Sequence, residues 1–327
     1  MTEIGVYHGD EEWVLKGIAQ DLANSLEKVK SISVLRTDQV FKGKRLDAEY
    51  HIFVQQGQLN KNCLNKKENV PDGTICLFTH LDITNFRPDI LSKCKAVIFN
   101  SSIQLSMAIA NGYNPKNAYL KPHAVNPKFH RIMKFDSPDM LHIIEQLRQS
   151  GCNLESRSSV GFCGRYWSKA TYTRRKNYSK IKKVVYELAD LKIPVVILGP
   201  GWEKLITQKS PFIFLINSSY KYYPVFYNLM RIFVSLSVHE GGPLPILESM
   251  CCGAYPIVTN TGFSLDVLRD QSDGIILDPF KPSSFYTEVI KSQFYSDHWN
   301  IYAIRKQASQ YSFDALAALI VKICNLK

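Results

Sequence analysis

Residues 237–266 read SVHEGGPLPILESMCCGAYPIVTNTGFSLD, with two glutamates eight residues apart around a Gly-Gly-Pro turn. Pro245 suits the start of a helix, where no backbone amide proton is needed, and Gly253 suits the left-handed residue that ends one. The spacing predicts a helix over Pro245 to Cys252, flanked by buried strands at IFVSLS and YPIVTN. Strand, loop, helix and strand in this order form a parallel-sheet unit, and ligands bind at the carboxyl ends of such strands.

The turn from Glu240 to Leu244 is a predicted anion site. A helix that begins there presents unpaired backbone amides and a partial positive charge. Glu240 is expected in the loop and Glu248 at the end of the first helical turn. The alternative is a capped core helix whose two glutamates are only solvated.

The segment resembles the donor site of retaining glycosyltransferases of the GT-B fold, above all glycosyltransferase family 4. The family pattern is Glu-Gly-x-Gly-Leu-Pro-x-x-Glu followed by Cys-Gly-x-Pro. It is matched here by Glu240, Gly241, Leu244, Pro245, Glu248, Cys252, Gly253 and Pro256. Pro243 replaces the second glycine and removes one amide donor. The resemblance implies that Glu240 binds the donor sugar, that Glu248 binds the ribose, and that the donor is lined by Gly241, Gly242, Pro243 and Leu244.

The resemblance extends over most of the chain and implies a diphosphate site. The motif GFCGR resembles the strand that opens the second domain of the family, whose arginine contacts the diphosphate, here Arg165. The family lysine is matched by Lys176 after a longer spacer, with Lys169 as a rival and Arg174 as a weaker one. Cations there would stabilise the charge that grows on the leaving diphosphate. No metal is expected, in agreement with the absence of any Asp-x-Asp pair.

Other candidates come from the same resemblance. Gly9 lies where a strand meets a helix, either to admit a ligand close to the backbone or as a plain tight turn. His80 matches a histidine near the donor sugar, with a structural histidine as the alternative. Asn217 and Ser218 align with residues whose backbone reads the nucleobase. Four tyrosines that follow either stack on a base or pack a helix: Tyr220, Tyr222, Tyr223 and Tyr227. Core packing is preferred for Tyr227.

Alternating strand and helix patterns predict an α/β fold. The resemblance implies two Rossmann-like doubly wound domains that face a central cleft. The predicted boundaries are an N-terminal acceptor-side domain over 1–129, an interdomain crossing over 130–158, a nucleotide-sugar-binding domain over 159–312 and a C-terminal helix over 313–327.

Composition fits a two-domain protein. The 327 residues are 45% hydrophobic, enough for two cores. No apolar run approaches the ~18 residues of a membrane span, and the N-terminus lacks the features of a signal peptide, so a cytoplasmic protein is expected. Eight cysteines without a Cys-x-x-Cys pair are expected as buried free thiols.

The net charge of +11 is concentrated in one run: residues 165–183 contain eight lysines and arginines and no acidic residue. The run is interpreted as a cradle for the donor diphosphate, as a peripheral contact with an anionic membrane, or as a solvated basic surface. Nucleic acid is not expected, because no matching fold signature accompanies the run.

The resemblance implies a hexosyl-type glycosyltransferase that moves a sugar from a nucleotide-diphosphate donor to a saccharide, lipid-linked or protein acceptor, with retention of anomeric configuration, in glycan or glycoconjugate biosynthesis. The resemblance implies that Arg165, Lys176 and His80 serve the transfer beside Glu240, and that no cofactor is needed. The nucleobase stays open. The alternatives are a GT-B epimerase, a sugar phosphorylase with a lysine-bound pyridoxal phosphate, and a non-catalytic sugar-nucleotide-binding protein.

Overall fold

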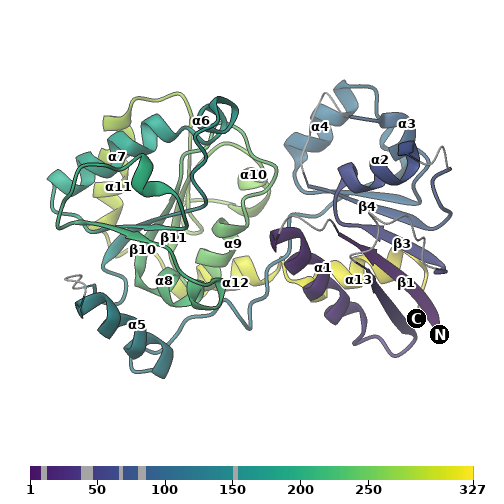
Figure 1. Cartoon of the computed structure of the whole chain (residues 1–327), viewed down its shortest axis with the longest axis horizontal. Coiled ribbons are helices and arrows are strands. Elements are labelled where there is room, and N and C mark those ends of the chain that lie inside the picture. Colours follow the sequence, from purple (N-terminus) through teal and green to yellow (C-terminus); the bar gives the residue numbers. More distant parts are fainter. Residues whose placement is uncertain (9–12, 38–46, 66–68, 80–85, 150–153, 327) are drawn as a thin grey trace. The chain divides into compact units, whose positions relative to one another are not determined.

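The chain forms two compact α/β units, each built on one six-stranded parallel sheet (Figure 1). The computed structural model describes residues 1–8, 13–37, 47–65, 69–79, 86–149 and 154–326. The first unit comprises Met1–Ala124 and Tyr311–Lys327, and the second comprises Val125–Gln310. The predicted class, α/β with two Rossmann-like domains, is confirmed.

The sheet of the first unit has the strand order β2-β1-β3-β4-β5-β6, with all neighbours parallel. Strands such as β4 and β5 are buried along their whole length, as expected for a parallel sheet covered by helices on both faces. The elements in chain order are β1 (Thr2–Tyr7), α1 (Trp13–Leu26), β2 (Ile32–Thr37), β3 (Tyr50–Phe53), α2 (Gln56–Asn65), β4 (Thr74–Phe78), α3 (Pro88–Leu91), β5 (Ala96–Phe99), α4 (Ser102–Ala110), β6 (Ala118–Leu120) and α13 (Phe313–Ile323).

The C-terminal helix α13 belongs to the first unit although it lies far away in sequence. It begins after Ser312, whose hydroxyl accepts a hydrogen bond from the amide of Ala315. Leu316 and Ile320 are buried, and α13 packs along α1 (Figure 1). The C-terminal end of the chain therefore completes the core of the N-terminal unit.

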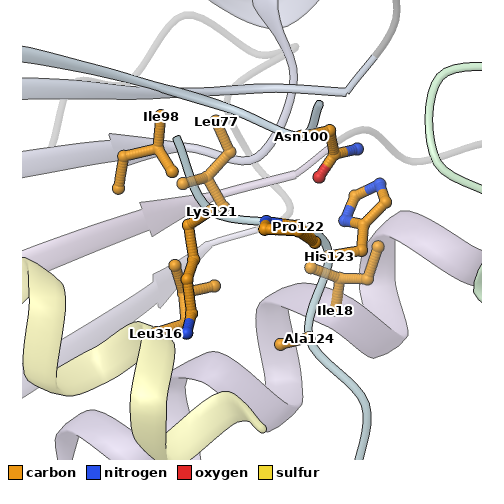
Figure 2. A pocket seen from close by; sticks show the side chains of 9 residues that line it. All are labelled: Ile18, Leu77, Ile98, Asn100, Lys121, Pro122, His123, Ala124 and Leu316. Atoms are coloured by element: carbon orange, nitrogen blue, oxygen red, sulfur yellow. The ribbon is translucent and has the colours of Figure 1, made fainter. Parts of the chain in front are cut away.

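The first unit contains a small cavity of about 10 Å³ (Figure 2). Its polar lining residues are Asn100, Lys121 and His123, which lie among aliphatic side chains. Burial lowers the pKa of Lys121, whose ammonium lies over the ring of Tyr311. A cavity of this size holds about one water molecule and is too small for a sugar.

The sheet of the second unit has the order β12-β11-β10-β7-β8-β9, again with all neighbours parallel. The elements in chain order are α5 (Pro138–Gln149), β7 (Ser159–Cys163), α6 (Ala170–Lys176), α7 (Tyr178–Asp190), β8 (Val195–Leu198), β9 (Ile213–Ile216), α8 (Tyr223–Leu229), β10 (Met230–Ser235), α9 (Leu244–Cys251), β11 (Tyr255–Thr259), α10 (Ser264–Val267), β12 (Ile275–Leu277), α11 (Ser283–Phe294) and α12 (Ile301–Ser309). From β7 the chain moves outward to β8 and β9 and then returns to β10 on the other side of β7. This reversal is the topological switch point at which doubly wound sheets bind ligands.

Helix α9 begins one residue earlier than predicted and ends one residue earlier. Pro243 is the residue before the helix and Pro245 occupies its second position, because either proline fits a place where no amide proton is needed. Gly253 follows the helix with φ +83°, which confirms the predicted left-handed position.

Residues 130–158, predicted as an interdomain crossing, lie within the second unit wherever the structure describes them. Helix α5 buries Met140, Ile143 and Ile144 and packs on α8. The boundary between the units falls after Ala124 rather than after residue 129. In the described ranges, no helix has both the length and the apolar character needed to cross a membrane.

Candidate active site

Glu240 lies in the loop after β10, at the carboxyl end of the sheet in the second unit. Its side chain is 5% exposed. One carboxylate oxygen, Oε1, accepts hydrogen bonds from Lys176 Nζ at 2.5 Å and from Ser237 Oγ at 2.8 Å. Its backbone amide donates to Thr261 Oγ1 at 2.9 Å. Three segments of chain, the end of α6 and the loops after β10 and β11, therefore hold Glu240 in one place.

The protonation of Glu240 follows from two opposing effects. Burial by itself raises the pKa of the carboxyl group, because it disfavours the charged form. The positive charges of Lys176 and Arg175, with the hydrogen bonds from Lys176 and Ser237, outweigh burial and lower the pKa below its usual value. Glu240 is therefore an ionised hydrogen-bond acceptor at neutral pH.

Glu248 lies on α9 and is held by two tyrosines. The hydroxyl of Tyr220 donates to Oε1 at 2.6 Å, and the hydroxyl of Tyr227 donates to Oε2 at 2.8 Å. Tyr227 on α8 is fully buried, as predicted, whereas Tyr220 lies in a short turn before α8 and is 38% exposed. Both oxygens of the buried carboxylate are thus fixed in orientation.

His130, which was not predicted from the sequence, completes the surroundings of Glu248. It is buried, and its Nε2 lies 3.8 Å from Glu248 Oε1. Arg305 on α12 donates to the carbonyls of Pro127, His130 and Cys251 at 2.7–3.0 Å. The arginine ties the segment that carries His130 to the end of α9. No local pattern indicates this contact, because it joins residues 178 positions apart.

Arg165 and Lys169 follow β7 and are both exposed. The carbonyl of Arg165 accepts a hydrogen bond from Tyr178 at 2.8 Å, which fixes the loop to α7. Lys169 precedes α6 and its side chain makes no cap hydrogen bond. Lys176, at the end of α6, contacts Glu240. Among the described residues, neither Lys169 nor Arg174 makes such a contact.

The glycine-containing turn beside Glu240 is packed against a second turn. Gly241 is buried, and Gly242, Pro243 and Leu244 are half-buried. Gly262, after β11, has φ +57°, and a Cβ there would lie 3.1 Å from Pro243 Cδ. Gly262 therefore permits this close approach, which sequence reasoning missed.

Two further predicted site residues lie on the segment that leads to Tyr220. Asn217 is exposed and Ser218 is half-buried, both between β9 and the turn that carries Tyr220. Gly9 and His80 lie outside the described residues.

The basic run of residues 165–183 does not form one uniform surface. Lys180 Nζ donates to the carbonyls of Pro279 at 3.0 Å and Lys281 at 2.5 Å. Lys182 lies over the ring of Tyr186, and Lys183 is exposed. The run thus divides into three parts. These are the residues near Glu240, Lys180 with its hydrogen bonds to backbone carbonyls, and Lys182 and Lys183, which are at least partly exposed.

In the described part of the chain, no group of three or more His, Cys, Asp or Glu residues could hold a metal ion. Six cysteines there are free thiols: Cys76, Cys94, Cys163, Cys251, Cys252 and Cys324. Burial raises the pKa of Cys163 to about 12, so this thiol beside Tyr227 stays protonated.

Comparison with known proteins agrees with this geometry. Residues 166–294 match the family described as glycosyl transferases group 1, a segment that contains Lys176, Glu240 and Glu248. Over 94 residues the chain is 32% identical to O-antigen chain mannosyltransferase B of Escherichia coli. The aligned segment covers 28% of this chain and only 24% of that relative.

Solved structures show the same fold. Sucrose-phosphate synthase from Thermosynechococcus elongatus superposes with a TM-score of 0.77 at 12% identity, over 99% of this chain and 98% of that chain. HepE of Anabaena, in complex with UDP and glucose, gives a TM-score of 0.66 at 12% identity over the same shares. These likenesses assign the GT-B fold to the chain.

The buried pair of Lys176 and Glu240 generates a stability prediction. Lys176→Met leaves a buried carboxylate without its cation, and we expect a loss of roughly 1–3 kcal/mol at neutral pH, less than a fully buried pair would cost because the lysine is partly exposed. The double variant Lys176→Met/Glu240→Gln should recover part of the loss. Urea unfolding of wild type, the two single variants Lys176→Met and Glu240→Gln, and the double variant measures this coupling.

The effect should depend on pH with a defined sign. The pKa of Glu240 is lowered in the folded protein, so the stability it contributes is present above the unfolded value of about 4.5 and is lost as pH falls through the folded pKa. The cost of Lys176→Met should therefore shrink at about pH 3. An equal cost at both pH values would contradict the ion-pair interpretation.

Proposed function

We propose that this protein is a glycosyltransferase that uses a nucleotide-diphosphate sugar as donor and retains the anomeric configuration. The observation that carries the proposal is the convergence of Lys176, ionised Glu240 and tyrosine-bound Glu248 near the switch point of the second sheet. The match of this region to glycosyl transferases group 1 supports the same function.

The chemistry follows from the charges. When the bond between the anomeric carbon and the diphosphate breaks, negative charge grows on the leaving group. Lys176 and Arg165 would stabilise that charge more in the transition state than in the ground state. Glu240, ionised and already hydrogen-bonded, would accept hydrogen bonds from sugar hydroxyls rather than donate a proton. With retention, the acceptor oxygen bonds to the same face of the anomeric carbon, and its proton passes to the departing phosphate oxygen.

Glu248 is the proposed ribose-binding residue. Each carboxylate oxygen can accept more than one hydrogen bond, so ribose hydroxyls can share Glu248 with Tyr220 and Tyr227. Tyr220, exposed next to Asn217 and Ser218 along the chain, is the proposed neighbour of the nucleobase. The UDP bound to HepE makes uridine the first base to test, and the mannosyltransferase relative makes mannose an early choice of sugar.

The acceptor is proposed to be a saccharide, free or carried on a lipid or protein. A cytoplasmic location, with or without peripheral membrane contact, belongs to the same proposal. The first unit is the proposed acceptor side.

The proposal is tested by thermal shift with a panel of UDP-, GDP- and ADP-sugars, followed by calorimetry and a transfer assay. A ligand present at 100 times its Kd should stabilise the protein by about 2.7 kcal/mol. Glu248→Gln should weaken binding of the nucleoside diphosphate by about 1–3 kcal/mol, because a charged hydrogen-bond acceptor is lost. Glu240→Gln should reduce sugar transfer more than nucleotide affinity.

The matched control is Glu288→Gln, which removes the charge of an exposed carboxylate on α11. It should change neither nucleotide affinity nor sugar transfer. Unchanged nucleotide affinity in Glu248→Gln would remove the ribose assignment. Binding without transfer or donor hydrolysis would instead indicate a non-catalytic sugar-nucleotide-binding protein.

A second prediction concerns metal dependence. Because lysine and arginine are proposed to balance the diphosphate charge, donor hydrolysis or transfer should persist in excess chelator. Activity that disappears with chelator and returns with magnesium or manganese would contradict the proposed role of these cations.

A third prediction concerns the membrane. Lys180 is bonded to the backbone of its own unit, so the test uses Lys182→Ala/Lys183→Ala. If these lysines contact anionic lipid, the variant should bind phosphatidylserine vesicles more weakly by at most about 1 kcal/mol per lysine, with turnover of soluble substrates unchanged. Cosedimentation that is equal for both proteins and insensitive to salt would exclude this surface as a membrane contact.

A further inference from the structure

Arg175 lies on α6 between two basic residues in different surroundings. Arg174 is exposed, whereas Lys176 pairs with Glu240. Arg175 is half-buried, and its carbonyl accepts hydrogen bonds from the backbone amides of Val238 at 2.8 Å and His239 at 3.3 Å. These amides belong to the loop that carries Glu240, so the backbone of Arg175 is anchored beside the candidate donor site.

The side chain of Arg175 is held by an aromatic ring rather than by a carboxylate. Its guanidinium lies over Tyr172, 5.3 Å from the ring centroid. Its Nε is buried and has no hydrogen-bond partner in the part of the chain that the structure describes. Tyr172 stacks on Trp167 with centroids 5.9 Å apart, and the guanidinium of Arg165 lies 4.6 Å from the centroid of Trp167.

This arrangement places both guanidinium groups against aromatic rings, with no carboxylate partner among the described residues. A ring face attracts a guanidinium electrostatically but neither neutralises it nor supplies a lone pair to its N–H groups in the plane. A carboxylate would do both. Glu240 already accepts hydrogen bonds from Lys176 and Ser237, and residues 165–183 contain no acidic residue. Arg175 also helps to keep the pKa of Glu240 low, after the larger effect of Lys176, so its charge acts on the site.

We propose that Arg175 is an additional phosphate-binding residue of the donor site, and that the stacked pair of Trp167 and Tyr172 holds Arg165 and Arg175 available for the diphosphate. The inference rests on the proposed function. A guanidinium fits two phosphate oxygens at once through its parallel N–H groups, which a lysine cannot do. Arg175 would act beside Lys176, the residue to which the sequence analysis gave Lys169 and Arg174 as rivals.

The neighbouring residue Arg174 provides a matched control on the same helix. Calorimetry of wild type, Arg175→Met, Arg175→Lys and Arg174→Met should use UDP, GDP and ADP, their parent nucleosides, and pyrophosphate. We expect Arg175→Met to lower the affinity for the nucleoside diphosphates and for pyrophosphate about 10- to 100-fold. The affinity for the parent nucleosides should stay unchanged. Arg175→Lys should be intermediate, and Arg174→Met should stay within about twofold of wild type.

The role of the aromatic pair is tested separately. Tyr172→Phe keeps the ring and should preserve diphosphate affinity, whereas Tyr172→Leu removes the ring and should weaken it several-fold. Tyr172 is 37% exposed, and melting curves of each variant show whether the fold is kept. Equal affinities for Tyr172→Phe and Tyr172→Leu would overturn this part of the inference.

The outcomes separate this inference from the proposed function. If wild type binds a nucleoside diphosphate and Arg175→Met binds it equally well, or if Arg174→Met loses as much affinity, the assignment of Arg175 is overturned while the donor site stands. If pyrophosphate binding requires Arg175 but none of the nucleoside diphosphates binds, the anion site stands and the proposed donor fails. If wild type binds none of these ligands, both are overturned.

Discussion

The second unit depends on the compensation of one buried charge. An isolated carboxylate in a protein interior is unstable, and it persists as an anion only where cations and hydrogen-bond donors replace the lost water. Lys176 and Ser237 do this for Glu240, and Thr261 fixes its backbone. These residues come from the end of α6 and from the loops after β10 and β11. The same interaction therefore brings three segments together at the carboxyl edge of the sheet and sets the shape of the candidate site.

The arrangement also fits the proposed reaction, in which negative charge grows on the leaving group. Lys176 is bound to Glu240 in the unliganded protein and lies on the same helix as Arg175, which has no carboxylate partner among the described residues. A site with more positive than negative charge attracts an anion, and the diphosphate of the proposed donor would supply one. Glu248 is organised differently, because two tyrosine hydroxyls donate hydrogen bonds to its two oxygens and Nε2 of His130 lies 3.8 Å from Oε1. A lysine thus holds one carboxylate, and tyrosine hydroxyls hold the other.

The local parts of this structure were predictable and the long-range parts were not. Apolar runs such as AVIF and YPIVT indicated strands, and Gly253 marked the end of α9, because each signal lies within a few residues. The spacing of the two glutamates around the turn made them site candidates, and their roles stay predictions. Helix α6 was missed, since ATYTRRK is short and has no apolar stripe. Arg305 and His130 were missed because the fold alone brings them to the end of α9. The site residues Gly9 and His80 lie outside the described residues and stay predictions.

The central claim is that the donor binds in the second unit, between the ends of β7 and β10. Hydrogen exchange of the intact protein, with and without a nucleotide sugar that shifts its melting temperature, tests this claim most directly. Amides protected by the ligand should concentrate in residues 164–178 and 237–250, because these segments carry Arg165, Lys176, Glu240 and Glu248. Protection confined to the first unit, with these two segments unchanged, would contradict the account.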